Sequence, residues 1–223
     1  MLRLRGRPLW RTIAGGSARY VEALTAPWRE RVRLSAPVRA IHRAADHVTV
    51  TARGGQPERF DHVVLAVHAD QALGMLADGS DREHAILGTF GYQANQAVLH
   101  TDTRLLPRRR RAWASWNYHL LGAPSGRPTV TYHMNRLQDL RTDVQLCVTL
   151  NRTEAIDPAR IIRTIDYAHP VYTAAGARAQ ARHEEISARG RTHYCGAYWG
   201  WGFHEDGVRS AYRVAQAIDP EAA

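Results

Sequence analysis

The segment with the clearest chemical potential runs from Thr192 to Ile218 and reads THYCGAYWGWGFHEDGVRSAYRVAQAI. We expect a short buried strand to end at Gly196, a glycine-rich bend to follow, and a helix to begin between Glu205 and Gly207. The N-terminus of a helix offers unpaired N–H groups and positive potential, so it favours electron-rich oxygen ligands. Glycines let a flat or phosphorylated ligand approach the backbone. An ordinary tight turn with its aromatic residues in the core explains the same pattern, and both interpretations stay open.

The side chains around this segment carry weaker chemical signals. His204 precedes the expected helix and is either a proton relay or a capping or surface histidine. Cys195 lies on an apolar strand and is expected to be a buried small hydrophobe, not a nucleophile. With Cys147 it makes only two cysteines, in no metal-ligand spacing, so the sequence predicts neither a disulfide framework nor a metal site. No catalytic residue is assigned.

Helices and strands in the first part of the chain must position this segment. A helix capped by Ser17 and limited by Pro27 is expected first, and Gly54-Gly55 is expected to be a turn. The run FDHVVLAV at 60–67 is typical of a strand covered on both faces, with a helix near 70–76 after it. The other strands expected in this part of the chain are 31–34, 38–43 and 47–52.

The middle of the chain has a different composition. It is rich in Trp, Tyr, Val and Thr between turn-prone stretches. It predicts a mostly antiparallel sheet of strands at 96–100, 112–120, 129–134 and 145–150. A strand at 161–165, a helix at 174–185 and a strand at 192–195 lead to the last helix. The predicted fold class is α/β (α+β). The run Arg108 to Arg111 is expected to be a solvated loop, not an anion site.

Composition excludes several classes of protein. The 223 residues are 44% hydrophobic and 23% charged, which suits a sizeable folded core. The net charge of +9 suggests a nucleic-acid binder. However, all 30 basic residues are Arg and they are scattered along the chain, so we predict that the protein has no nucleic-acid partner. No stretch is long and apolar enough for a transmembrane segment or a secretory signal. A reduced, bacterial, cytoplasmic protein is expected.

Several blocks in order resemble the C-terminal half of bacterial FAD-dependent oxidoreductases. These predicted NAD/FAD-binding proteins belong to the flavin-containing amine oxidase, protoporphyrinogen oxidase and phytoene desaturase superfamily. The blocks are GRPLWRTIAGGSARYVEAL, VRLSAPVRAIHR, FDHVVLAVHADQAL, ASWNYHL, TVTYHMNRLQDL, CVTLN, AHPVYT and CGAYWGWGFHEDGVRSAYRVA. The resemblance implies a partial Rossmann-like FAD-binding domain combined with a substrate-domain sheet. It places FAD-binding parts at 1–80 and 186–223 and the substrate-binding domain at 81–185.

The resemblance also implies roles for individual residues toward FAD. The backbone of Val38 would face the adenine end, and the strand ending at Ala66 would lie beside the dinucleotide. Gly196 would let the chain pass the pyrophosphate and ribityl region. The helix starting at Gly207-Val208 would aim its N–H groups at the pyrimidine end, where negative charge accumulates on reduction.

Two further groups of residues follow from the resemblance. Gly15 and Gly16 would sit near the flavin or the pocket, while Ser17 is expected to cap its helix. The candidate pocket residues for a small-molecule substrate are Trp116, Tyr132, Trp201 and Phe203, although core packing is the favoured explanation for each.

The sequence departs from the family in three local features. Amine oxidases of the superfamily commonly place a lysine near flavin N5, and this chain has no lysine. Many members have an acidic residue after the glycine matching Gly196, where this chain has Ala197-Tyr198. His133 stands where an aromatic such as Trp is expected. These differences favour a desaturase-like or otherwise unassigned oxidoreductase acting on an apolar or amine-bearing substrate.

The G-x-G-x-x-G turn that holds the FAD pyrophosphate does not occur in the sequence. We therefore expect a C-terminal fragment whose N-terminal half is supplied by the full-length or a split gene. Alone, it is expected to bind FAD weakly and to be inactive and poorly soluble. The alternative is a non-catalytic remnant or interaction module without a cofactor.

Overall fold

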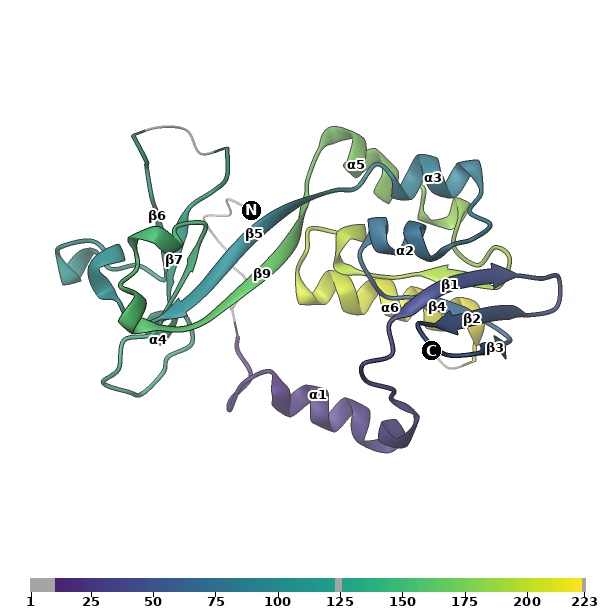
Figure 1. Cartoon of the computed structure of the whole chain (residues 1–223), viewed down its shortest axis with the longest axis horizontal. Helices are drawn as coiled ribbons and strands as arrows, with labels where there is room; N and C mark the ends of the chain where they lie inside the picture. The colour runs from purple at the N-terminus through teal and green to yellow at the C-terminus, as the bar shows by residue number, and fades with distance from the viewer. Residues whose placement is uncertain (1–10, 123–125, 222–223) are drawn as a thin grey trace. The chain divides into compact units, whose positions relative to one another are not determined.

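The computed structural model describes residues 11–122 and 126–221, and the chain forms two compact units (Figure 1). Unit 1 comprises Met1–Ser35 and Val98–Arg163, and unit 2 comprises Ala36–Ala97 and Thr164–Ala223. The predicted ranges 1–80, 81–185 and 186–223 divide the chain elsewhere, because the N-terminal segment groups with the middle strands. The functional assignment of those ranges stays a prediction. The first residues of the block that begins at Gly6 lie outside the described residues.

Unit 1 begins with helix α1 (Ala18–Thr25), which runs directly into a 3-10 segment, η1 (Ala26–Arg31). Ser17 occupies the N-cap position as predicted, but its side chain makes no capping hydrogen bond. The strand predicted at 31–34 is wrong. Pro27, at the start of η1, suits the tight helical turn, and the exposed residues after it have no sheet partner.

The sheet of unit 1 is built from β6 (Trp116–Tyr118), β7 (Val130–His133) and β8 (Cys147–Leu150). Both β6–β7 and β7–β8 are antiparallel, which confirms the predicted sheet. With β5 (Gly91–His100) and β9 (Ile161–Val171), each of which has residues in both units, the order is β6-β7-β8-β5-β9.

Short helical turns connect these strands. The strand predicted at 112–120 is shorter than expected because a 3-10 turn occupies Arg110–Ala112 and the Asn117 side chain then bonds the backbone of Ala114. The helix α4, which follows β7, was not predicted. The turns are η2 (Thr103–Leu105), η3 (Arg110–Ala112), α4 (Met134–Leu137), η4 (Thr153–Ala155) and η5 (Pro158–Arg160).

Unit 2 contains two small sheets. The strands β1 (Val38–Arg43), β2 (Val48–Ala52) and β3 (Pro57–Phe60) form an antiparallel sheet, in agreement with the predicted hairpin. The strand β4 (Val63–Leu65) pairs in parallel with β10 (Thr192–Tyr194).

The prediction of one strand over 60–67 is wrong, because Phe60 pairs with Val48 in the antiparallel sheet and a bend at Asp61 separates it from β4. Burial on both faces is wrong as well, since Val64 is 43% exposed.

Helices surround the parallel strands of unit 2. They are α2 (Ala69–Met75), α3 (Asp81–Leu87), α5 (Ala174–Gln180) and α6 (His204–Ile218), with 3-10 turns η6 (His183–Glu185) and η7 (Ala197–Trp199). The helix predicted at 174–185 is split between α5 and η6. A buried cluster that includes Ile41, Leu65, Ile86 and Tyr194 packs β1, β4, α3 and β10 together. In the part of the chain that the structure describes, no helix is long and apolar enough to cross a membrane.

Glu83 of α3 ties three elements of unit 2 together. Its carboxylate accepts hydrogen bonds from Arg43 of β1 (2.5 Å) and from the hydroxyl of Tyr194 of β10 (2.5 Å). Ser80 caps α3, and its hydroxyl also donates to the Glu83 carboxylate, in the S-x-x-E pattern of a capping box. Burial by itself would raise the pKa of Glu83, but these hydrogen bonds lower it to about 2. The helix was not predicted, although SDRE was a usable sign of it.

Candidate cofactor site

The carboxyl ends of the two parallel strands lie at one edge of their sheet. Leu65 of β4 is opposite Tyr194 of β10, and the Cys195 N–H donates to the Leu65 carbonyl at 3.2 Å. Ala66 and Gly196 therefore leave the sheet together at this edge. Ligands of α/β proteins bind beyond the carboxyl ends of parallel strands. The structure thus brings together two of the residues predicted to bind FAD.

Helix α6 is fastened to the same edge by a serine. The Gly196 N–H donates to Ser210 Oγ at 2.8 Å, and the Ser210 hydroxyl donates to the Gly207 carbonyl at 2.7 Å. This contact sets Gly196 beside the first turn of α6. Ser210 was not predicted as a site residue, although its place one turn after Gly207 is visible in the sequence.

Gly196 is also required by the packing of the protein itself. Its φ is 155°, and a Cβ there would lie 2.6 Å from Cε1 of the buried Tyr198 ring. Tyr198 in turn packs edge-to-face against Phe90, with ring centroids 5.0 Å apart. The small size of Gly196 therefore has a structural cause in addition to any cofactor role.

The N-terminus of α6 lies one residue before Glu205 and three before Gly207, the two limits between which the helix was expected to begin. The helix begins at His204, and the Gly207 N–H already donates to the Phe203 carbonyl at 3.2 Å. His204 and Glu205 are the first two residues of α6, and in the described part of the chain their backbone N–H groups donate to no carbonyl. These two groups, rather than those of Gly207 and Val208, are the open donors.

Asp206 shapes the bend before α6. Its Oδ2 accepts hydrogen bonds from the backbone N–H groups of Trp201 and Phe203, each at 3.0 Å. A Cβ on Gly200 would lie 2.5 Å from this carboxylate, so the glycine makes room for it. Asp206 was not predicted as a site residue, because its role depends on the bend folding back onto the helix.

Gly207 has space around it that the protein does not use. A Cβ there would meet nothing closer than Ala197 at 3.9 Å. A glycine in a helix costs about 1 kcal/mol relative to alanine, so protein packing does not explain this residue. The space would allow a ligand to approach the backbone of the first turn, so the site fits a flat cofactor such as FAD.

Val38 begins β1, an edge strand of its sheet. Its pairing with Ala52 is followed by an irregularity that leaves Arg39 as an extra residue. An edge strand directs alternate backbone groups away from its neighbour. Further along this edge, the Ile41 carbonyl accepts a hydrogen bond from the Ala77 N–H at 3.0 Å. The backbone of Val38 thus lies on the outer edge of this sheet, which the chain itself occupies further along at Ile41.

Gly15 and Gly16 belong to unit 1, not to the residues gathered in unit 2. Both have a left-handed conformation, with φ of 83° and 91°, in a turn closed by the Gly16 N–H and the Ile13 carbonyl at 3.0 Å. This turn explains why glycine occurs twice. Their role toward a cofactor stays a prediction.

The four candidate pocket residues form two separate aromatic groups. Trp116 and Tyr132 face each other across β6 and β7 in unit 1, with ring centroids 6.1 Å apart. In unit 2, Trp201 packs near Tyr172 at 5.9 Å. Trp116 is 59% exposed and Trp201 is 64% exposed, so core packing is the wrong explanation for both. Phe203 is also partly exposed, at the N-cap of α6.

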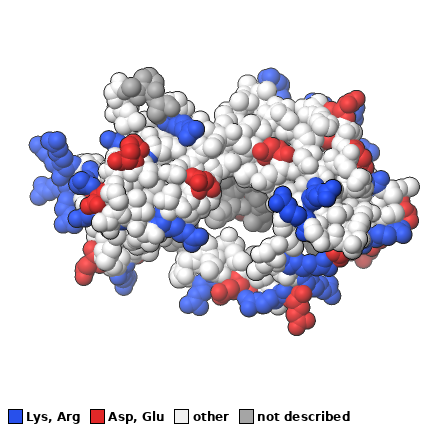
Figure 2. Space-filling model, in the orientation of Figure 1, with Lys and Arg blue, Asp and Glu red and all other residues white. Residues whose placement is uncertain are grey.

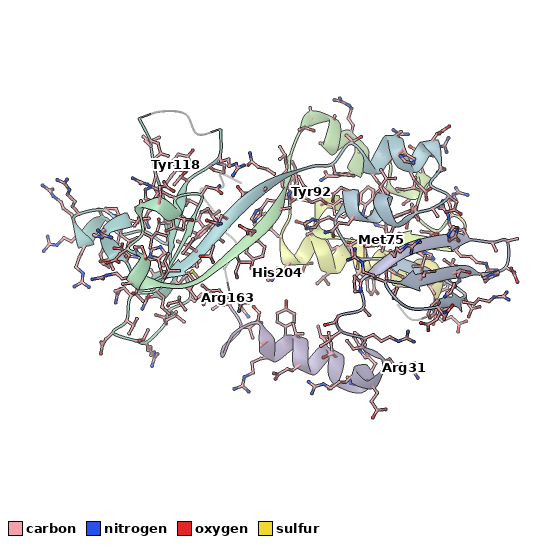
Figure 3. The ribbon with its side chains drawn as sticks, in the orientation of Figure 1. Arg31, Met75, Tyr92, Tyr118, Arg163 and His204 are labelled. Atoms are coloured by element: carbon pink, nitrogen blue, oxygen red, sulfur yellow. The ribbon has the colours of Figure 1, made fainter. Side chains whose placement is uncertain are left out.

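The other residues noted in the sequence differ in their exposure to solvent and in their contacts. His204 is exposed as the first residue of α6 and is not its capping residue (Figure 3). Cys195 and Cys147 are buried and free, and burial raises the pKa of both thiols, so Cys195 is the small hydrophobe that was predicted. His133 contacts the ring of Trp113 edge-to-face at 5.1 Å and bonds Gln145. Within the described residues, no group of three His, Cys, Asp or Glu side chains could hold a metal.

Solved structures share this fold. Cyclohexylamine oxidase from Brevibacterium oxydans is 16% identical over 93% of this chain and 53% of that one, with a TM-score of 0.64. Putrescine oxidase bound to putrescine is 13% identical over 94% and 53%, with a TM-score of 0.62. A fatty acid isomerase from P. acnes that produces CLA is 16% identical over 90% and 52%, with a TM-score of 0.59. This chain spans about half the length of these proteins.

The sequence comparison with protein families gives the same result. No curated protein sequence matches the chain. The profile of the flavin-containing amine oxidoreductases matches residues 2–219, nearly the whole chain. FAD is the cofactor of that family, in agreement with the cofactor predicted from the sequence. The chain belongs to the flavin-containing amine oxidoreductases.

Proposed function

We propose that this chain is the rear part of an FAD-dependent oxidoreductase that removes hydride from an apolar or amine-bearing substrate. The observation that carries the proposal is the convergence of Ala66, Gly196 and Gly207 at the carboxyl edge of β4 and β10. Bound FAD supplies a two-electron acceptor, while the protein supplies binding, orientation and electrostatics.

Each part of the site has a separate task in this proposal. The outward edge of β1 at Val38 receives the adenine end, and the chain around Ala66 and Gly196 passes the pyrophosphate. The open N–H groups of His204 and Glu205 lie at the positive end of the α6 dipole. They stabilise negative charge at the pyrimidine end when the flavin is reduced. Asp206 holds the bend that keeps these donors in place.

The substrate class rests on the aromatic surface of unit 2. Tyr172, Trp201 and Phe203 expose large apolar area beside the N-terminus of α6. Such a surface suits an aliphatic or aromatic substrate, including the body of an amine. The absence of lysine favours a desaturase-like reaction over that of a typical amine oxidase.

The pyrophosphate needs a phosphate loop that this sequence does not contain. We propose that an additional N-terminal segment or a separate polypeptide provides it and pairs with the parallel strands. In the described chain, β4 and β10 form a two-stranded sheet, Thr192 of β10 also bridges to Arg189, and Val64 leaves an apolar side chain exposed. A parallel strand bearing the loop would extend this sheet and cover that side chain.

A cytoplasmic location stays a prediction from cysteine usage.

The first experiment is to sequence the DNA immediately upstream of the Met1 codon. A strand–G-x-G-x-x-G–helix there, in frame or one frameshift away, identifies the missing segment. The joined protein should retain flavin through gel filtration, whereas the 223-residue chain alone should retain little. A joined protein without flavin contradicts the proposal, and a chain that stays yellow by itself contradicts the need for the segment.

A non-catalytic module is the second candidate, and the absent phosphate loop is the observation that favours it. It predicts that no upstream segment is encoded and that neither the chain alone nor a co-expressed partner confers flavin binding. Substrate oxidation by a flavin-loaded form of the protein would exclude it.

A further inference from the structure

Unit 1 contains a cavity of about 430 Å³ that is distant in the sequence from the residues of the cofactor site. It is lined by two helical turns, the end of β6 and the segment around Arg152. Its polar lining comes from three arginines, one histidine, Asn117 and Tyr118, and no acidic residue among those that the structure describes contributes to it. The lining includes the polar residues Arg104, Arg108, His119 and Arg152 and the apolar residues Leu105, Leu106 and Ala155.

Arg152 is held by a histidine rather than by a carboxylate. Its Nη1 donates to His119 Nδ1 at 2.6 Å. Because arginine only donates, Nδ1 is the acceptor, and the ring proton is on Nε2. That Nε2–H donates to Thr131 Oγ1 at 2.8 Å. Burial, and then the neighbouring Arg152, lower the pKa of His119, so this ring is neutral and leaves the arginine charge uncompensated.

A row of buried polar groups continues across the sheet from this histidine. Thr131 of β7 and Thr149 of β8 are paired residues with their hydroxyls 2.8 Å apart, and both are fully buried. His100 Nε2, at the end of β5, donates to Thr149 Oγ1 at 2.7 Å. The row follows the strand order β7-β8-β5, so the sheet itself fixes its spacing.

The row ends at a second arginine of the cavity. His100 Nδ1 accepts the backbone N–H of Asp102 at 3.1 Å. The buried Asp102 carboxylate accepts from Arg104 Nε at 2.9 Å and from Arg104 Nη2 at 2.6 Å. Arg104 is 66% exposed despite this pairing. Both arginines are therefore oriented by one hydrogen-bonded row before any ligand arrives.

The charges of the cavity do not cancel. Asp102 compensates Arg104, and the Arg104 guanidinium holds the pKa of that carboxyl well below its usual range. Arg108 and Arg152 have no carboxylate within ion-pair distance among the described residues. Figure 2 shows blue arginines on the surface of the part of unit 1 that carries β6 and β7 in Figure 1. Arg108 was expected to be merely solvated, and it is exposed, but it also lines this cavity.

We propose that this cavity binds a small organic anion, with its carboxylate or phosphate group between Arg152, Arg108 and Arg104. The two remaining donor nitrogens of Arg152, Nε and Nη2, have no partner in the described chain and can form a two-pronged contact with oxygen atoms. The apolar side of the cavity, at Leu105, Leu106 and Ala155, receives the rest of the ligand. The site is independent of the proposed flavin chemistry.

The test is calorimetric titration of the 223-residue chain with benzoate, phenyl phosphate and benzyl alcohol. We expect saturable one-to-one binding of at least one anion, with a dissociation constant on the order of 1 mM that increases with salt. Benzoate and phenyl phosphate distinguish a carboxylate site from a phosphate site. The neutral alcohol should not bind, because it lacks the charge.

Variants locate the binding. Arg152→Gln should weaken anion binding roughly 10-fold or more, and Arg152→Lys should lose part of the affinity because it cannot form the two-pronged contact. Arg108→Gln, which changes an exposed side chain, should weaken it about two- to five-fold without affecting folding. Arg136→Gln, on exposed α4 and outside the lining, is the matched control and should change nothing. Absence of saturable binding, or equal affinity in Arg108→Gln, Arg152→Gln and Arg136→Gln, would overturn the proposal.

Discussion

The two units each bury a carboxylate beside an arginine, but they use the pair differently. In unit 2, Glu83 is bonded to Arg43, and the exposed fractions of the two side chains are 3% and 13%. In unit 1, Asp102 is completely buried, yet its partner Arg104 remains mostly exposed and lines a cavity. A closed pair fixes elements to one another, whereas an open pair presents an oriented charge to a ligand. The charge of Arg43 therefore serves the fold, whereas the charge of Arg104 remains available for binding.

The largest effect should follow from breaking the closed pair. Glu83→Gln leaves Arg43 without its best-buried partner and weakens the junction of β1, α3 and β10. Loss of one member of a buried ion pair costs about 3–5 kcal/mol, so the free energy of unfolding should decrease by that amount. Urea unfolding followed by circular dichroism measures it. Glu185→Gln, which removes an exposed ion pair with Arg182, is the control and should leave the unfolding midpoint nearly unchanged.

Acid should act on the same pair. The pKa of Glu83 is lowered from 4.5 to about 2 in the folded protein, so its stabilising effect is complete above pH 4.5. That contribution is lost as the pH falls from 4.5 toward 2, and its full size is about 3 kcal/mol. Unfolding free energies measured at pH 7, 5, 4 and 3 should show the decline. Glu83→Gln should flatten this part of the curve, and identical slopes in both proteins would contradict the assignment.

Breaking the open pair should cost less. In Asp102→Asn, Arg104 is released into water rather than stranded in the core, because its side chain is already mostly exposed. The remaining loss is that of the buried acceptor for the Arg104 side chain and the Asp157 N–H. We expect destabilisation of about 1–2 kcal/mol in the same urea experiment. A loss as large as that of Glu83→Gln would mean that the two pairs do not differ in the way proposed.

How far the sequence predicts these features depends on how local they are. The strand Val38–Arg43 and the last helix, ending at Ile218, follow from periodicity in their own residues, and both were predicted to within one or two residues. Thr131 and Thr149 meet only because β7 and β8 pair in one register, which no local pattern reveals. The division at Asp61 is similar, since the pairing of Phe60 with Val48 overrides a continuous apolar run.

The candidate cofactor site shows the same limit. Ala66 and Gly196 could be proposed from the resemblance to a family, and the structure places them at one edge of a sheet. Asp206 and Ser210 were missed because their contacts arise only when the bend folds back onto α6. Conversely, the run Arg108 to Arg111 was predicted to be a solvated loop, and the sequence gives no sign of the cavity beside Arg108.

The smallest effect on stability is expected from Gly207→Ala. This variant tests whether unit 2 binds its ligand through the backbone, whereas unit 1 is proposed to bind its ligand through charged side chains. Gly207→Ala places a methyl group in unused space within a helix, so it should stabilise the fold by up to about 1 kcal/mol. If FAD lies against this turn, the same methyl group should weaken flavin binding by the joined protein, measured by quenching of flavin fluorescence.

Gly74→Ala in α2 is the matched control, since its Cβ would meet nothing within 4 Å and that of Gly207 would meet only Ala197 at 3.9 Å, and it should stabilise the protein without affecting flavin. Gly196→Ala should instead destabilise the protein, because its Cβ would collide with Tyr198. Equal flavin affinity in Gly207→Ala and Gly74→Ala would show that the first turn of α6 does not contact the cofactor. The side-chain site of unit 1 should be indifferent to all three glycine variants, because its donors belong to arginines that the polar row of its own sheet holds in place.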